Sequence, residues 1–406
     1  MRWQKLWAKT LSHDIIHTWG VPADSVGYGN GAYMKRKIYA VLGALLVLFH
    51  VLVRTQEGFA DTYRRVCFPF VVSTFSRITG QFPFSVGEGL ILAGLILTIL
   101  LVLGALLFLF TRKSKKPFGM GFSKGYRRYA GIYAWILLGL GWIMSLNCYV
   151  FYGCSSFNDM YIKKDGATQE YTTKELIELR DYVIRQANAL SKELPRDENG
   201  MLIYDGDMEA QCAKEIERLG ELYPQLSGYC PRGKGIHSSK FLSQQYIMGY
   251  YFPFSMEANY NTEMYIANVP ATVCHELAHL HGFIYEDDAN LIGYLACVTS
   301  EDPFFQYSGY LSVIAYLNDD LYKSLDKNKQ LYKTYRQCNN RVKKDMVFLT
   351  KEAWTEVEKN AVVKTTTVKK ASNAFLNANL NLNGVEEGVA SYGEVVQRLL
   401  EYYEEN

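Results

Sequence analysis

The sequence lacks an excess of charge of either sign, since its 406 residues include 43 Lys and Arg against 41 Asp and Glu. This balance argues against a nucleic-acid-binding protein, which normally carries a strongly basic surface. Among the eight cysteines no two have the Cys-x-x-Cys spacing, so a structural zinc site built from cysteines has no support. Long apolar runs are absent after residue 153, and we expect that part of the chain to form an ordinary soluble domain.

Three long apolar runs lie before that point, at residues 38–53, 89–110 and 130–152. The second has no charged residue and is long enough to cross about 30 Å of hydrocarbon, and the third is also uncharged. The first is short for a span, and a buried or interfacial helix is its alternative. No small-residue cleavage site follows it, so removal as a signal peptide is not expected. The runs predict three transmembrane helices and a lipid bilayer as partner.

The distribution of basic residues predicts the orientation of these helices. Residues 111–129 contain seven basic residues and no acidic one, which is typical of a cytoplasmic loop. Residues 1–37, with six basic residues, are expected to form a cytoplasmic N-terminal segment. It follows that residues 54–88 form an external loop and residues 153–406 a domain outside the cytoplasmic membrane. Such a location permits disulfides, and Cys212 with Cys230 is the favoured pair.

The C-terminal part is predicted to be mostly helical. Thr172 and Glu175 have the spacing of a capping box, and apolar residues then recur at helical intervals to about residue 194. Residues 249–270 are rich in aromatics and lack a helical period, which indicates one small sheet. Within them, residues 255–261 are either an edge strand along which a peptide binds or an ordinary structural strand. Further helices are expected at 206–224, 286–298, 308–324, 328–348 and 350–360.

The segment HELAH, residues 275–279, is an H-E-x-x-H motif. On an α-helix, His275 and His279 lie about 40° apart around the axis, so both imidazoles can reach one metal ion. Glu276 can then reach a water on that metal and act as general base. Zinc suits two neutral imidazoles and a carboxylate, with an open fourth position. The alternative is a polar helix face with coincidental spacing, but the apolar neighbours predict a buried helix on which these groups need partners.

A third ligand is needed, and Glu286 is favoured over its rival Asp288. On an uninterrupted helix Glu286 would lie about 10 Å along the axis from His279, too far to share an ion. Gly282 can take the left-handed conformation and end the helix, which lets Glu286 begin a second helix that faces the histidines. His281 points to nearly the opposite side and is expected to be a capping or surface residue.

H-E-x-x-H followed by Glu286-x-x-Ala289-Asn290 resembles the gluzincin pattern of zinc peptidases, in which a second helix contributes E-x-x-A-D or a close relative. The resemblance implies Glu286 as the third ligand and Asn290 as a hydrogen-bonding partner of a ligand. Asp288 is a further candidate for a supporting role, apart from the resemblance. Asparagine stands where aspartate is commoner, and the gap between the two motifs is shorter than in most gluzincins.

A donor that stabilises an oxyanion is also expected in a zinc peptidase. His237, Tyr285 and Tyr310 are candidates, each with packing or hydrogen bonding as its alternative role. Cys274 and Cys297 lie on the two helices of the predicted site and are interpreted as small core residues, or as a pair, rather than as ligands.

A second resemblance covers most of the chain. It rests on the segments FPFSVGE (82–88), GYYFPFSMEANYN (249–261), CHELAHLHGFIYEDDANLIGYLAC (274–297), YSGYL (307–311) and VASYGEVVQRLL (389–400). These resemble an uncharacterised bacterial membrane family, domain of unknown function 3810, which has N-terminal spans followed by a zincin-like domain and no assigned substrate. The expected fold is mainly α: three N-terminal transmembrane helices, then an extracytoplasmic zincin-like α+β domain with a small sheet.

Together these observations predict a membrane-anchored zinc metallopeptidase that hydrolyses a peptide or an envelope protein outside the cytoplasmic membrane. The alternative is a non-catalytic membrane sensor or scaffold whose zinc holds two helices together, although such a site normally closes its fourth position with another protein ligand. An intramembrane protease is excluded because the motif lies in a segment with too many polar residues to span. No nucleic-acid partner is expected.

Overall fold

The computed structural model describes residues 29–162, 171–382 and 394–405. The described chain is mainly helical, with one three-stranded sheet and three helices long and apolar enough to cross a membrane. Its contacts divide the chain into two units, Met1–Leu48 and Phe49–Asn406. The predicted combination of apolar N-terminal helices, a largely helical C-terminal part and a small sheet is confirmed.

The candidate spans extend beyond the apolar runs of the sequence. The helix α3 (Gly29–Thr55) contains a candidate span of 23 residues, so the first run is lengthened at both ends. The helix α6 (Val86–Thr111) follows the second run closely. The helix α7 (Pro117–Asn147) has 31 residues and is therefore about 46 Å long, more than the hydrocarbon thickness. Its basic first turns occupy most of the expected loop, and only residues 112–116 connect α6 to α7.

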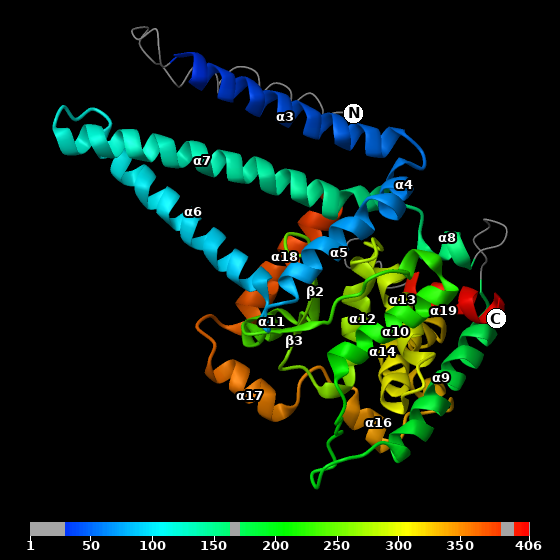
Figure 1. Ribbon diagram of the computed structural model, residues 1–406. Helices are drawn as coiled ribbons and strands as arrows, with labels where there is room; N and C mark the ends of the chain where they lie inside the picture. The colour runs from blue at the N-terminus through cyan, green and yellow to red at the C-terminus, as the bar shows by residue number, and fades with distance from the viewer. Residues whose placement is uncertain (1–28, 163–170, 383–393, 406) are drawn as a thin grey trace. The chain divides into compact units, whose positions relative to one another are not determined.

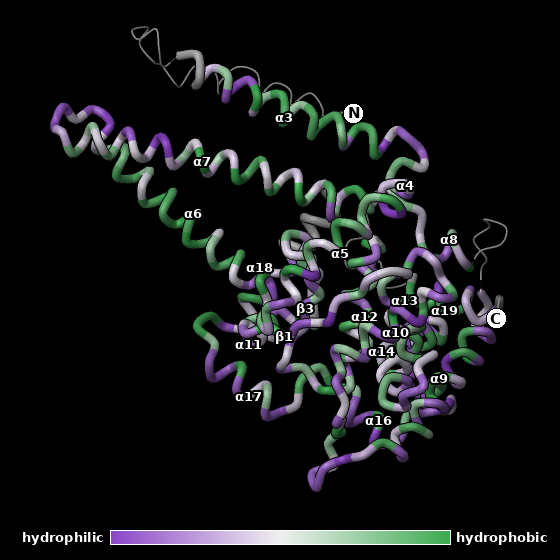
Figure 2. Tube along the Cα trace, in the orientation of Figure 1, coloured by the Kyte–Doolittle hydropathy of each residue, from purple (hydrophilic) through white to green (hydrophobic). Residues whose placement is uncertain are grey.

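The helices α6 and α7 form an antiparallel hairpin (Figure 1). The Tyr129 hydroxyl donates to the carbonyl of Leu97 at 2.6 Å, and the hydroxyls of Thr98 and Tyr133 lie 2.7 Å apart. The residues of α6 are almost all apolar (Figure 2), and many of their side chains are exposed, as expected for a helix surrounded by lipid.

Two helices that the sequence did not predict occupy the segment expected to be an external loop. They are α4 (Phe59–Val66) and α5 (Phe68–Thr79). One side of α5 is buried against the C-terminal part, and its Ser76 hydroxyl donates to the carbonyl of Met256 at 2.7 Å. The segment is therefore packed structure rather than a free loop.

The sheet has the strand order β1-β3-β2. Its strands are β1 (Lys234–Ile236), β2 (Gly249–Phe252) and β3 (Glu257–Asn261), and β3 pairs parallel to β1 and antiparallel to β2. The segment 255–261, considered above as an edge strand, therefore contains the central strand. The strand β2 forms an edge instead.

The remaining elements form a helical body around α12 (Val269–His279), which contacts α10, α13, α14, β2 and β3. Almost every side chain of α12 is buried. The other elements are η1 (Tyr149–Gly153), α8 (Phe157–Tyr161), α9 (Thr173–Glu193), α10 (Met208–Leu222), η2 (Pro224–Leu226), α11 (Ser239–Gln245), η3 (Ile266–Asn268), α13 (Glu286–Val298), α14 (Pro303–Ser324), α15 (Lys329–Tyr332), α16 (Asn340–Asp345), α17 (Lys351–Lys359), α18 (Thr365–Leu382) and α19 (Glu394–Glu405).

Most predicted helices are confirmed, but the single helix expected at 328–348 is wrong. The chain forms the short helices α15 and α16 there. Asn339 lies between them, caps α16 with its side chain, and donates its backbone N–H to Asn188 of α9 at 2.7 Å. These contacts with a distant helix interrupt the helical pattern.

The predicted capping box of α9 is present, because the Thr172 hydroxyl accepts from Glu175 N–H while the Glu175 carboxylate accepts from Thr172 N–H. The favoured disulfide is absent. Cys212 and Cys230 are both buried. All eight cysteines lie among the residues that the structure describes, and each is a free thiol.

Candidate metal centre

The site is built on α12 and α13, and a sharp turn joins them. Pro270 lies in the first turn of α12, where its missing N–H costs nothing. The helix ends at His279, and Gly282 takes the left-handed conformation with φ of 83°, as predicted. The N–H of Gly282 donates to the His279 carbonyl at 3.0 Å, which closes the turn. Glu286 then begins α13.

The two helices approach closely because Gly293 of α13 has no side chain. A Cβ at that position would lie 2.9 Å from the Ala271 carbonyl oxygen and 3.0 Å from the backbone nitrogen of His275. This contact fixes α13 against the part of α12 that carries the motif.

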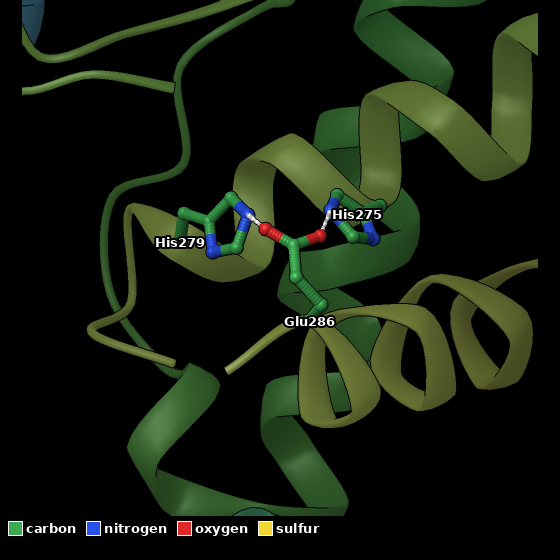
Figure 3. A group of neighbouring side chains, drawn as sticks. All are labelled: His275, His279 and Glu286. Carbon is green, nitrogen blue, oxygen red and sulfur yellow. Dashed lines mark ion pairs between the residues drawn. The ribbon is translucent and has the colours of Figure 1, made fainter. Parts of the chain in front are cut away.

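His275, His279 and Glu286 converge on one point (Figure 3). The Nε2 atom of His275 lies 3.1 Å from one carboxylate oxygen of Glu286, and that of His279 lies 3.9 Å from the other. One donor atom from each of the three residues lies within 4.8 Å of the others. The distances fit three ligands around a single ion.

Hydrogen bonds on the far side of each imidazole orient these Nε2 atoms. The Nδ1 atom of His275 lies 3.0 Å from Oδ1 of Asn290, and Nδ1 of His279 lies 2.7 Å from the carbonyl oxygen of Phe283. Both oxygens can only accept, so each Nδ1 carries the hydrogen and each Nε2 keeps a lone pair when the ring is neutral. Such support is typical of histidines that bind metals.

The cluster perturbs its own pKa values. Burial alone would lower the pKa of His275, but the hydrogen bond and charge of Glu286 outweigh it and raise the pKa to about 9. Burial would raise the pKa of Glu286, but His275 overcomes this effect and lowers it to about 2. Burial and the charge of His275 lower the pKa of His279 to about 4. Without a cation the cluster therefore holds a proton between His275 and Glu286, which a metal ion would displace.

Glu276 lies beside the cluster and contacts the sheet. Its carboxylate is buried and accepts a hydrogen bond from the backbone N–H of Tyr251 in β2. Burial raises its pKa to about 8. The ring centroid of Tyr251 lies 6.1 Å from that of His279, so this strand adjoins both the acid and the ligands.

A second contact holds the turn from the direction of α4. The buried guanidinium of Arg64 lies 4.8 Å from the ring centroid of Phe283, whose carbonyl orients His279. Asp61 pairs with Arg64 at 2.7 Å. Neither Arg64 nor the Tyr251 contact was predictable from the sequence, because both depend on packing between distant segments.

Asp288 does not join the cluster. Its Oδ2 atom accepts from the N–H of Phe157 at 2.9 Å, and its Oδ1 atom is buried without a hydrogen-bond partner. Burial, and then the neighbouring charge of Asp287, raise the pKa of Asp288 to about 7. The structure therefore brings Glu286 to the histidines and directs Asp288 toward α8.

Of the three oxyanion candidates, Tyr285 lies next to the cluster. Its hydroxyl donates to the carbonyl of Tyr152 at 2.9 Å, and the two rings meet edge to face with centroids 5.6 Å apart. Burial raises the pKa of Tyr152, and nearby charges that include Glu286 add to the effect. Tyr152 follows the third span and had no distinguishing pattern in the sequence.

The other two candidates lie elsewhere. His237 is exposed just after β1, and its backbone N–H donates to Glu88 of α6. The hydroxyl of Tyr310 lies 3.3 Å from that of Tyr182 within a cluster of tyrosines. The expectation that His281 lies at the surface is wrong, because the residue is buried.

The chain was compared with known proteins. A family model described as a protein of unknown function (DUF3810) matches residues 63–400. The chain belongs to this family. No curated protein and no solved structure matches it. The DUF3810 region begins within α4 and ends within α19, so it includes α6, α7, the sheet and the three-residue cluster, whereas α3 lies outside it.

Proposed function

We propose that this DUF3810 chain is a membrane-anchored, zinc-dependent metallopeptidase whose C-terminal part lies outside the cytoplasmic membrane. The convergence of His275, His279 and Glu286 beside the buried Glu276 carries the proposal. Two imidazoles and one carboxylate are a donor set of catalytic zinc sites. Zinc bound by these residues would supply Lewis-acid chemistry, activating water and polarising a carbonyl group.

The accessibility of the cluster favours catalysis over a structural role. The side chain of Glu286 is 45% exposed, and that of His275 is 14% exposed. Among the residues that the structure describes, three donors and no fourth form the group. A structural zinc site usually has four protein ligands, whereas a catalytic one leaves a position for water or substrate.

Glu276 is placed to move protons. The N–H of Tyr251 bonds to its carboxylate, and a carboxylate beside a metal-bound water can take a proton and release it again. In the proposed reaction Glu276 takes a proton from the attacking water and delivers it to the leaving amine.

The strand β2 offers a surface for an extended peptide. Its neighbour β3 pairs through Asn261 N–H, which donates to the Met248 carbonyl at 2.7 Å. In this antiparallel register Gly249 turns its backbone groups away from β3, as does Tyr251, whose N–H already donates to Glu276. A substrate strand could pair there, beside Glu276.

The ends of the α6–α7 hairpin support the external placement. Basic residues gather around the connection at 112–116, as in cytoplasmic loops. The opposite end of the hairpin contacts the sheet, since the N–H of Gly87 donates to Glu257 of β3 at 2.7 Å and the Asn147 amide donates to Pro253 at 2.9 Å. The C-terminal part and the basic connection would then lie on opposite sides of the membrane.

Glu276→Gln tests the proposal in the purified full-length chain. Zinc content and cleavage of a peptide library are measured for this variant, the wild type and a control, Glu221→Gln, on the exposed end of α10. The variant should keep zinc and lose hydrolysis by about 10²- to 10⁴-fold, while the control keeps both. Unchanged turnover would remove Glu276 from the mechanism. A wild-type chain that binds zinc and cleaves nothing would favour a sensor or scaffold.

A further inference from the structure

An apolar patch surrounds α5. Six apolar side chains there are exposed, and we call them the juxtamembrane patch: Val66, Phe70, Phe75, Ile78, Phe82 and Phe84. Phe70 is 75% exposed, which is unusual for a phenylalanine in water. Phe68 and Val72, on another side of α5, are buried against protein, so apolar residues of this helix lie both in the core and at the surface.

The patch is continuous with the surface of α6 that faces lipid. Phe84 lies two residues before the first residue of α6, and the apolar side chains of α6 are exposed from Leu90 onward. Phenylalanine and other large apolar residues form the membrane-facing side of interfacial helices. A helix with such an apolar side lies in the plane of the interface, with that side about 5–10 Å into the boundary between headgroups and acyl chains.

The buried side of α5 contacts the β-hairpin formed by β2 and β3, which adjoins the metal centre. The Ser76 hydroxyl donates to the carbonyl of Met256 at 2.7 Å, and the Thr79 hydroxyl donates to that of Ser255 at 3.1 Å. Both carbonyls belong to the turn between β2 and β3. The β2–β3 hairpin is therefore fixed to α5, the helix that carries the juxtamembrane patch.

The helices α6 and α7 also form hydrogen bonds to β3 and β2. Glu257 of β3 accepts from the N–H of Gly87, in the first turn of α6, and from Lys234, each at 2.7 Å. The hydroxyl of Tyr251 in β2 donates at 2.7 Å to the carbonyl of Asn147, the last residue of α7. Since the N–H of Tyr251 also binds Glu276, one residue connects the end of a span to the proposed general base.

We infer that the juxtamembrane patch inserts into the bilayer surface and holds the metal centre there, so that the substrate is a membrane-anchored protein cut close to its span. One helix diameter, about 10 Å, separates the patch from the hairpin. An extended chain advances about 3.3 Å per residue, so about three residues cover this distance and bonds a few residues from a span come within reach. The substrate class rests on the proposed peptidase activity, whereas insertion of the patch does not.

Spin labelling tests the insertion without any need for activity. The full-length chain, with Cys67→Ser to remove an exposed thiol, is placed in vesicles of phosphatidylethanolamine and phosphatidylglycerol. A label at Phe70→Cys should be relaxed by oxygen and shielded from a water-soluble nickel chelate, and a label at Glu198→Cys, on an exposed turn, should show the reverse. If the label at Phe70→Cys were relaxed by the nickel chelate as strongly as the label at Glu198→Cys, insertion of the patch would be wrong. Coupling between labels on two copies would contradict insertion as well, because it would assign the patch to a dimer.

Cleavage of anchored peptides tests the substrate class. One cleavable peptide is attached to a transmembrane anchor, either within ten residues of it or about thirty residues away, and is also supplied free. The wild type should cut the near position at least about tenfold faster than the distant one. Phe70→Asp with Ile78→Asp should reduce near cleavage about tenfold and leave cleavage of the free peptide unchanged, because these residues lie outside the metal centre.

The outcomes separate the two claims. Equal cleavage at both positions, or equal losses for near and free peptides in the double variant, would overturn the substrate class while leaving the peptidase in place. A wild type that cuts no peptide would overturn the peptidase and its substrate class together, and the label at Phe70 would still decide the insertion.

Discussion

Two acidic centres in the C-terminal part differ in how their carboxylates are partnered. Asp345 is buried and accepts four hydrogen bonds: two from Arg196 at 2.6 and 3.0 Å, one from Tyr265 at 3.0 Å and one from Tyr307 at 2.6 Å. Glu286 is 45% exposed and faces the Nε2 atoms of two imidazoles, and it shares a single proton with His275. A satisfied carboxylate such as Asp345 has no capacity left for a ligand, so it holds the fold together. The donor atoms of His275, His279 and Glu286 instead converge on one point, which is typical of a site that binds an ion.

Glu286→Ala should produce the largest effect on metal binding. Loss of a ligand removes one of three protein donors, so tight zinc binding should disappear, measured by competition with a chelator. The metal-free protein should lose only a modest part of its stability, because Glu286 is half-exposed and its main contact is the ion pair with His275. Asp288→Ala is the matched control and should keep zinc. If Asp288→Ala lost zinc and Glu286→Ala retained it, Glu286 would not be the third ligand.

Asp345→Ala should have the opposite profile. Removing this carboxylate leaves the partly buried Arg196 and two tyrosine hydroxyls without their acceptor, at a cost of about 3–5 kcal/mol in the free energy of unfolding. Zinc per folded chain should not change. Thermal unfolding and metal content of the same preparation provide the two readings. If the variant and the wild type were equally stable, the hydrogen bonds of Asp345 would not stabilise the fold.

Asn290→Ala should have the smallest effect of the three. His275 loses the acceptor of its Nδ1 hydrogen, so its ring orientation and tautomer are less well fixed. Loss of such a supporting bond typically weakens zinc binding by about 10- to 100-fold. Asn290→Asp should largely restore affinity, since a carboxylate also accepts this hydrogen bond. An Asn290→Ala affinity equal to that of the wild type would contradict the role of the bond.

The arrangement of the site was largely predictable because its parts lie close together in the sequence. Four-residue spacing places His275 and His279 on one side of a helix, and Gly282 is the residue that permits the turn to Glu286. Contacts from distant segments were not predictable. Arg64 reaches the turn from more than 200 residues away, and its contact with Phe283 leaves no local pattern.

The same distinction holds for the fold. The hydropathy pattern located the three candidate spans because burial in lipid requires continuous apolar sequence. It did not reveal α5, because a helix of 12 residues offers only about three turns of pattern. The break between α15 and α16 was missed because Asn339 bonds to Asn188 of another helix.

X-ray absorption at the zinc edge, on the full-length chain loaded with one equivalent of zinc, tests the central claim most directly. The account predicts one bound zinc with two imidazole nitrogens at about 2.0–2.1 Å, oxygen in the remaining positions and no sulfur. Glu286→Ala should eliminate this signal. A chain that binds no zinc would contradict the account, and so would a spectrum with zinc–sulfur distances of about 2.3 Å, which would assign the metal to the buried cysteines near α12.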